Sequence, residues 1–279
     1  YLEKKKKSIK QEFNYYTNLL PQFISKINNT NIQIHSDLKP IFIMGLPRSG
    51  TTLIESIISS NDQINQGGEI GAINKVFYKE NLITNYDSEI LNTHFSFDKD
   101  SFQNLQESIL DQYNQSGINL LNGFFTDKSL ENFLYIDLIY KIFPKAKFIY
   151  CKRNKFANLI GILKVFLPGL LWTHSISKII SIINLYDNKL RNIISEKKIK
   201  LKIVEIENFS NNPEEISEHL FEFLGIKSDK KILDKFFNNK KIIQTVSNLQ
   251  VRKKISKHNL DYLNNYLPHL EKHEIKKLN

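Results

Sequence analysis

The stretch "IFIMGLPRSGTTLIESIISS", residues 41–60, decides the fold of this 279-residue chain. It opens with a short continuous apolar run, which is typical of a strand buried on both faces of a parallel sheet. A loop of Gly, Pro, Arg, Ser and Gly follows, and an apolar stripe at helical spacing begins after Thr51. The stretch therefore predicts a strand, a tight loop and a helix in succession.

The loop itself is built like an anion-binding loop. Residues 45–52 have the spacing G-x-x-x-x-G-T-T, whereas the general phosphate-binding loop reads G-x-x-x-x-G-K-[S/T]. Glycines let the backbone curl so that N–H groups point inward, and the following helix directs its positive end at the same point. The alternative, a plain strand–turn–helix junction, would not require all of these features together. The residues predicted to surround the anion are Pro47, Arg48, Ser49, Gly50, Thr51 and Thr52.

Thr51 stands where a lysine reaches the β- and γ-phosphates of a nucleoside triphosphate. Without that lysine, the loop suits a ligand with a single bridging phosphate and a short group attached to it. Arg48 lies within the loop and can reach the group beyond that phosphate. The missing lysine counts against a nucleotide kinase or NTPase, which is one alternative reading of the motif.

Further along the chain, apolar strands alternate with amphipathic helices. This order predicts an α/β, P-loop-like three-layer fold with a central parallel sheet and helices on both faces. Residues 1–35 are predicted as an N-terminal helical segment, which could be the end of a helical-repeat region that binds proteins, and residues 36–279 as the main domain. Strands are expected at 41–46, 123–128, 147–153 and 200–209, and helices at 1–29, 51–60, 72–79, 101–116, 131–143, 155–166, 174–197 and 212–225.

Composition narrows the classes of partner. The formal charge of +10 permits an anionic ligand, but the lysines are scattered and are not interleaved with aromatic residues, so no nucleic-acid interface is expected. No apolar run reaches the roughly 18–20 residues of a membrane span, and the N-terminus does not look like a signal peptide. The single cysteine, Cys151, excludes an intrachain disulfide and is expected to be a buried strand residue. These features favour the cytoplasm. His269 and His273 lack a third ligand, so no metal site is expected.

Several ordered blocks resemble those of one enzyme family. The block "PIFIMGLPRSGTTLIESIISS" is similar to the 5′-phosphosulfate loop of sulfotransferases, and "GGE" at 67–69, "FTDKSLENF" at 125–133 and "IFPKAKFIYCKRN" at 142–154 continue the resemblance. It extends over residues 40–270 and is nearest to the branch with tetratricopeptide repeats, which is related to tyrosylprotein sulfotransferases. The resemblance implies transfer of a sulfuryl group from 3′-phosphoadenosine 5′-phosphosulfate to an acceptor hydroxyl of a protein, glycan, lipid or small alcohol, without a metal.

The resemblance also implies roles for individual residues. Glu69 would be the base that accepts the proton of the hydroxyl. Lys128 would contact the bridging oxygen or the sulfuryl group, and Arg48 would face the same group. Arg153 would hold the 3′-phosphate.

The match is weaker at the nucleotide end. Gly161 stands where the family has a serine that helps to hold the 3′-phosphate, and Ile206 stands where the family often has a tyrosine. The tail block "TVSNLQVRKKI" at 245–255 keeps Ser247, Arg252 and Lys253, which would close over the nucleotide. The losses leave open a second alternative, a sulfotransferase fold that binds ligands but no longer catalyses.

Overall fold

A computed structural model gives the architecture of the chain. It describes residues 9–84, 90–120, 123–227, 232–238, 260–270 and 276–278. Five parallel strands form the central sheet, in the order β2-β5-β1-β6-β7. Their bounds are β1 Lys39–Met44, β2 Ile64–Asn65, β5 Phe124–Asp127, β6 Lys147–Lys152 and β7 Leu201–Glu205.

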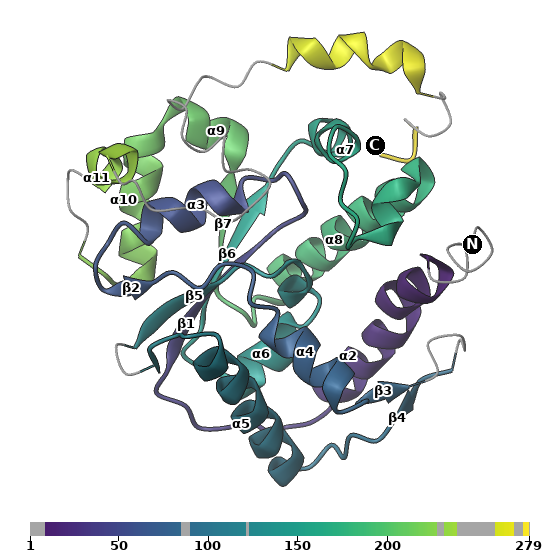
Figure 1. The fold of residues 1–279 in the computed structure, drawn as a ribbon, viewed down its shortest axis with the longest axis vertical. Helices are drawn as coiled ribbons and strands as arrows, with labels where there is room; N and C mark the ends of the chain where they lie inside the picture. The colour runs from purple at the N-terminus through teal and green to yellow at the C-terminus, as the bar shows by residue number, and fades with distance from the viewer. Residues whose placement is uncertain are drawn as a thin grey trace.

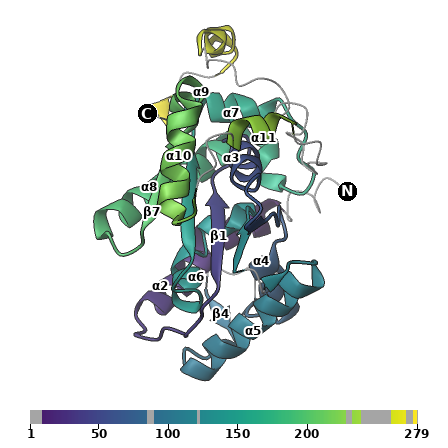
Figure 2. The same cartoon turned by 90° about the vertical axis from the view of Figure 1, so that its left-hand side faces the viewer.

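Helices cover both faces of this sheet (Figure 1). One face carries α3 (Thr51–Ile58), α10 (Pro213–Leu224) and α11 (Ile232–Asn238), which lie together in both views (Figure 2). The other face carries α2 (Leu20–Asn28), α4 (Ala72–Lys79), α5 (Lys99–Gln115), α6 (Ile136–Ile142) and α8 (Ile176–Glu196). The predicted three-layer α/β fold is therefore correct.

Alternation along the strands divides the core into two layers. In β1, Ile41 and Ile43 pack toward α3 and α10, whereas Phe42 and Met44 pack toward α6 and α8. Cys151 of β6 is buried in the first of these layers, as expected.

The N-terminal segment is helical from residue 9, with a π-helical turn at Tyr15–Leu19 before α2. Phe23 of α2 packs edge-on against Phe77 and Phe95. The N-terminal helical segment thus shares one hydrophobic core with the residues that follow β1.

Two predicted elements differ in the structure. The expected strand 200–209 ends at Glu205, and Ile206–Asn211 forms helix α9. Ile206 and Phe209 are three residues apart and both buried, which places them on one face of a helix, whereas in a strand they would point to opposite faces. The expected helix 131–143 is split into a 3₁₀ turn, Leu130–Phe133, and α6, because Phe133 leaves the helical path to pack between Tyr150 and Tyr186.

A small antiparallel pair, β3 (Ile83–Thr84) and β4 (Asn92–Thr93), lies outside the central sheet. The helix α7 (Lys155–Leu163) follows β6 and approaches the loop between β1 and α3. Within the described ranges, no helix combines the length and apolarity that a bilayer crossing demands.

Candidate active site

The loop between β1 and α3 is tightly enclosed by its neighbours. A Cβ atom on Gly45 would lie 2.6 Å from the carbonyl oxygen of Cys151 and 2.5 Å from Ser49 Oγ. Gly50 has a φ of 90°, and a Cβ there would lie 2.5 Å from Ile206 Cδ1. Both glycines of the motif are therefore required by close approach as well as by backbone conformation.

Arg48 adopts a left-handed conformation with a φ of 69°, which is costly for a residue other than glycine. Its carbonyl oxygen accepts a hydrogen bond from Arg153 Nη1 at 2.6 Å, and the carbonyl oxygen of Pro47 accepts one from Asn158 Nδ2 at 2.6 Å. Side chains from β6 and α7 thus hold the loop in its strained form.

This arrangement concentrates positive charge. Partial burial lowers the pKa of Arg48, and the neighbouring charge of Arg153 lowers it further. Two guanidinium groups close to one another, at the start of helix α3, favour an anionic ligand that offsets their repulsion.

Gly161 of α7 lies against both arginines. A Cβ atom there would be 3.2 Å from Arg48 Cβ and 3.3 Å from Arg153 Nη1. Because Gly161 has no side chain, the two arginines can approach α7 closely. The motif in the sequence did not predict this contact.

Ser49 offers a further donor. It is 1% exposed, and within the described part of the chain its Oγ has no hydrogen-bond partner. A buried hydroxyl costs free energy unless it is satisfied, so a bound oxyanion would be stabilised by it. The donors around the loop therefore suit a bound oxyanion.

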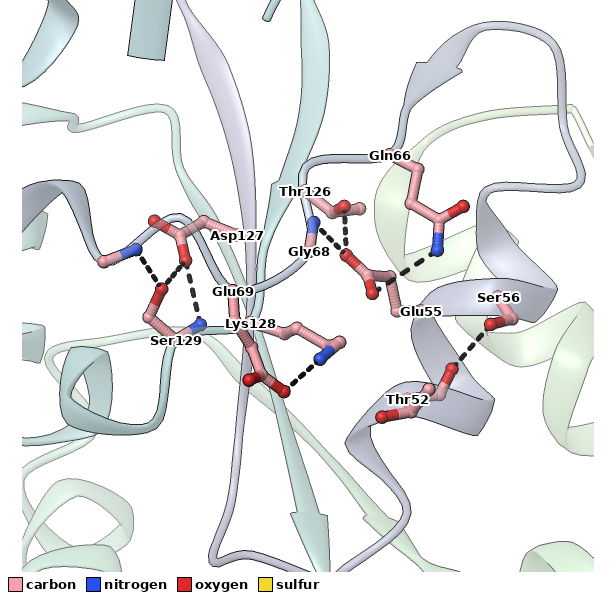
Figure 3. A network of polar contacts seen from close by, with 11 residues as sticks. Thr52, Glu55, Ser56, Gln66, Gly68, Glu69, Thr126, Asp127, Lys128 and Ser129 are labelled. Carbon is pink, nitrogen blue, oxygen red and sulfur yellow. Dashed lines mark hydrogen bonds and ion pairs between the residues drawn. The ribbon is translucent and has the colours of Figure 1, made fainter. Parts of the chain in front are cut away.

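A second set of residues follows β2 and β5. Lys128 Nζ pairs with Glu69 Oε1 at 2.5 Å (Figure 3). The lysine side chain is 0% exposed, whereas the glutamate side chain is 61% exposed. The pair thus joins a buried cation to a carboxylate that a second molecule can reach.

The loop carrying Glu69 is held to the end of β5. Lys128 N–H donates to the carbonyl oxygen of Gly68 at 2.9 Å, and Gly71 N–H donates to Ser129 Oγ at 2.6 Å. Ser129 in turn donates to Asp127 Oδ1 at 2.6 Å. Burial raises the pKa of Asp127, and its hydrogen bonds from Ser129 oppose that rise. The backbone on both sides of Glu69 is therefore held by hydrogen bonds to residues at the end of β5.

A pocket of about 350 Å³ opens beside Arg153, at the carboxyl ends of β6 and β7. Lys155 and Asn158 of α7 line one side, and Asp187 of α8 lines another. Lys155 Nζ pairs with Asp187 Oδ2 at 3.0 Å, so these opposite charges offset one another across the pocket.

The predicted site residues fall into three groups. The loop residues, Arg153 and Gly161 lie together, and Glu69 and Lys128 form a direct pair. Ser247, Arg252 and Lys253 lie outside the described residues.

Sequence reasoning missed Glu55 and Asn158, both of which contact the loops of the site. A glutamate beside the apolar stripe of helix 51–60 was a usable signal for the first. No local signal marked Asn158.

The comparisons agree with this geometry. The profile of the sulfotransferase family matches residues 40–230, so the chain belongs to the sulfotransferase family. An uncharacterized protein of Aquifex aeolicus (strain VF5) is 26% identical over 252 residues, covering 85% of this chain. The chain spans 32% of that relative's length.

Solved structures show the same fold at low sequence identity. The sulfotransferase domain of the Synechococcus PCC 7002 olefin synthase matches with a TM-score of 0.58 and 17% identity, covering 89% of this chain and 97% of that one. The sulfotransferase domain of the curacin biosynthetic pathway matches with a TM-score of 0.53 and 15% identity, covering 86% and 96%. A sulfotransferase of Mycobacterium tuberculosis H37Rv matches with a TM-score of 0.50 and 9% identity, covering 90% and 80%.

Proposed function

We propose that this protein transfers a sulfuryl group from 3′-phosphoadenosine 5′-phosphosulfate to an acceptor hydroxyl, as a member of the tetratricopeptide-repeat-associated branch of the family. The observation that carries the proposal is that two groups of residues follow the carboxyl ends of strands in the same parallel sheet. One is the loop with Arg48 and Arg153, and the other is the pair of Glu69 and Lys128. Ligands of open parallel sheets bind at this edge.

Each of the two groups of residues serves a different part of the proposed reaction. The bound co-substrate supplies an activated sulfuryl group, whose S–O bond to the 5′-phosphate breaks as the acceptor oxygen bonds to sulfur. Arg48, the hydroxyl of Ser49 and the start of α3 offset the charge of the phosphosulfate. Arg153 would hold the 3′-phosphate, as the resemblance to the family motif implies, and Gly161 stands at the position of the motif's serine.

Glu69 and Lys128 serve the acceptor and the leaving group. The exposed carboxylate of Glu69 accepts the proton of the hydroxyl as the new bond forms. The buried ammonium of Lys128 offsets negative charge on the bridging oxygen as the old bond breaks. Since Lys128 is paired with Glu69 in this structure, binding of both substrates must draw its ammonium away from the carboxylate.

Calorimetry with adenosine 3′,5′-bisphosphate, followed by an assay of radiolabelled sulfuryl transfer to a panel of alcohols, tests the proposal. We expect binding of the bisphosphate, and no comparable stabilisation by ATP–Mg²⁺ because Thr51 replaces the lysine of nucleotide kinases. A larger thermal shift with ATP–Mg²⁺ would overturn the assignment.

A second candidate function is ligand binding without catalysis. Gly161 offers no hydroxyl, and Nη1 of Arg153 donates to the carbonyl oxygen of Arg48 in the loop. Binding of the bisphosphate by a protein that transfers no sulfuryl group to any alcohol of the panel would favour this reading.

A further inference from the structure

Glu55 is a buried carboxylate that neither the loop motif nor the catalytic pair includes. It lies in the second turn of α3 and is 0% exposed. Its neighbours along the helix, Ile54 and Ile57, are core residues. A carboxylate in such surroundings is costly unless it is hydrogen-bonded and compensated by charge, so its partners are informative.

Within the described part of the chain, the hydrogen bonds to the Glu55 carboxylate come from donors outside α3 (Figure 3). Gly68 N–H donates to Oε1 at 2.8 Å, Thr126 Oγ1 donates to the same oxygen at 2.7 Å, and Gln66 Nε2 lies 3.5 Å from Oε2. Thr126 Oγ1 also accepts the N–H of Gly67 at 2.9 Å. The carboxylate of Glu55 therefore joins α3 to the loop after β2 and to the end of β5.

The negative charge of Glu55 is offset by groups in the loop after β2 and at the end of β5. Burial raises the pKa of Glu55, while the positive charge of Lys128 and the hydrogen bonds from Thr126 and Gly68 oppose that rise. Lys128, whose side chain has no exposed surface, thus lies near two carboxylates, Glu69 and Glu55.

We propose that Glu55 is a positioning residue that couples the phosphosulfate loop to the catalytic pair. The helix that begins at Thr51 carries Glu55 one turn later, and Glu55 holds the N–H of Gly68, the residue before Glu69. A shift of either loop therefore moves the other. The same carboxylate provides a second negative charge for Lys128 when its ammonium leaves Glu69. This role rests on the proposed sulfuryl transfer.

The test compares two substitutions that break the link. Glu55→Gln keeps the volume but places an amide where only donors converge, and Thr126→Val removes the hydroxyl with little change of shape. Thr126→Ser retains the hydroxyl and is the conservative rescue. Ser60→Ala is the matched control, because Ser60 is also buried in the region of α3 and donates only to the carbonyl oxygen of Ser56.

We expect Glu55→Gln and Thr126→Val to lower kcat by about 10- to 100-fold, since misplacing reacting groups by about 1 Å can cost 100-fold. Affinity for adenosine 3′,5′-bisphosphate should change less than about threefold, because the hydrogen bonds of the Glu55 carboxylate in the described part of the chain go to Gln66, Gly68 and Thr126 and not to the loop residues 47–50. Thr126→Ser and Ser60→Ala should keep kcat near that of the unmodified protein. Wild-type kcat in Glu55→Gln and Thr126→Val would overturn the proposal.

Hydrogen exchange separates this proposal from the proposed reaction. Amides of residues 66–71 should exchange faster in Glu55→Gln and Thr126→Val than in Ser60→Ala, whether or not the protein transfers sulfuryl groups. Absence of transfer by the unmodified protein would refute the reaction alone. Unchanged exchange in residues 66–71 would refute the role of Glu55 alone.

Discussion

The left-handed backbone of Arg48 leads to a prediction about the relative stability of two variants that both lose the guanidinium group. Its φ of 69° costs a residue with a Cβ atom roughly 1–2 kcal/mol relative to glycine. Glycine also gives up more conformational entropy on folding, by roughly 0.5–1 kcal/mol. Arg48→Gly should therefore be more stable than Arg48→Ala by about 1 kcal/mol, which follows from these two ranges.

A difference of that size corresponds to a melting temperature about 2–4 °C higher for a domain of about this length. Differential scanning calorimetry of the two variants measures it. Both variants should also lose sulfuryl transfer, because the guanidinium is absent from each. The reasoning is refuted if Arg48→Gly melts at or below the temperature of Arg48→Ala, because the loop would then carry no strain that glycine relieves.

Three further predictions concern the site and its surroundings. Glu69→Gln and Lys128→Met should each lower kcat by roughly 100-fold or more; near-normal turnover in Glu69→Gln would require another base. Gly161→Ser should bind adenosine 3′,5′-bisphosphate about 2- to 12-fold more tightly than Gly161→Ala, which corresponds to one hydrogen bond of about 0.5–1.5 kcal/mol. Equal Kd values of the two variants, measured by calorimetry, would show that the serine hydroxyl does not reach the ligand. Burial raises the pKa of Glu12 from 4.5 to about 7. The folded state therefore binds this proton more tightly than the unfolded state, and stability falls as the pH rises between these values. Glu12→Gln should flatten this part of the plot of melting temperature against pH, and an unchanged slope would contradict the raised pKa of Glu12.

The sequence was most informative where local rules agree with the global fold. The apolar run before Gly45 predicted the central strand, and the close packing of Gly45 and Gly50 explains why the loop motif was recognisable. The predicted helix 212–225 also matches α10. Pro213 stands at its start, and Gly225 adopts the left-handed conformation at its end.

Tertiary contacts decided the features that the sequence could not show. The run after β7 reads Ile-Glu-Asn-Phe, and its two apolar residues, Ile206 and Phe209, are buried from helix α9 and not from a continued strand. The close approach of Gly161 to Arg48 and Arg153 joins segments more than a hundred residues apart. No local pattern encodes such a contact.

The sheet order explains why the loop that carries Glu69 needs several hydrogen bonds from side chains. Glu69 follows β2, an edge strand that pairs with β5 through only the register positions Ile64 and Asn65. So short a pairing leaves the following loop weakly defined by backbone hydrogen bonds alone. Glu55 and Ser129 supply the missing restraints from α3 and from the end of β5, and both bind backbone N–H groups within three residues of Glu69. The geometry of the proposed base therefore depends on buried polar side chains more than on the sheet itself, so substitutions at these ties should disturb turnover before they disturb the fold.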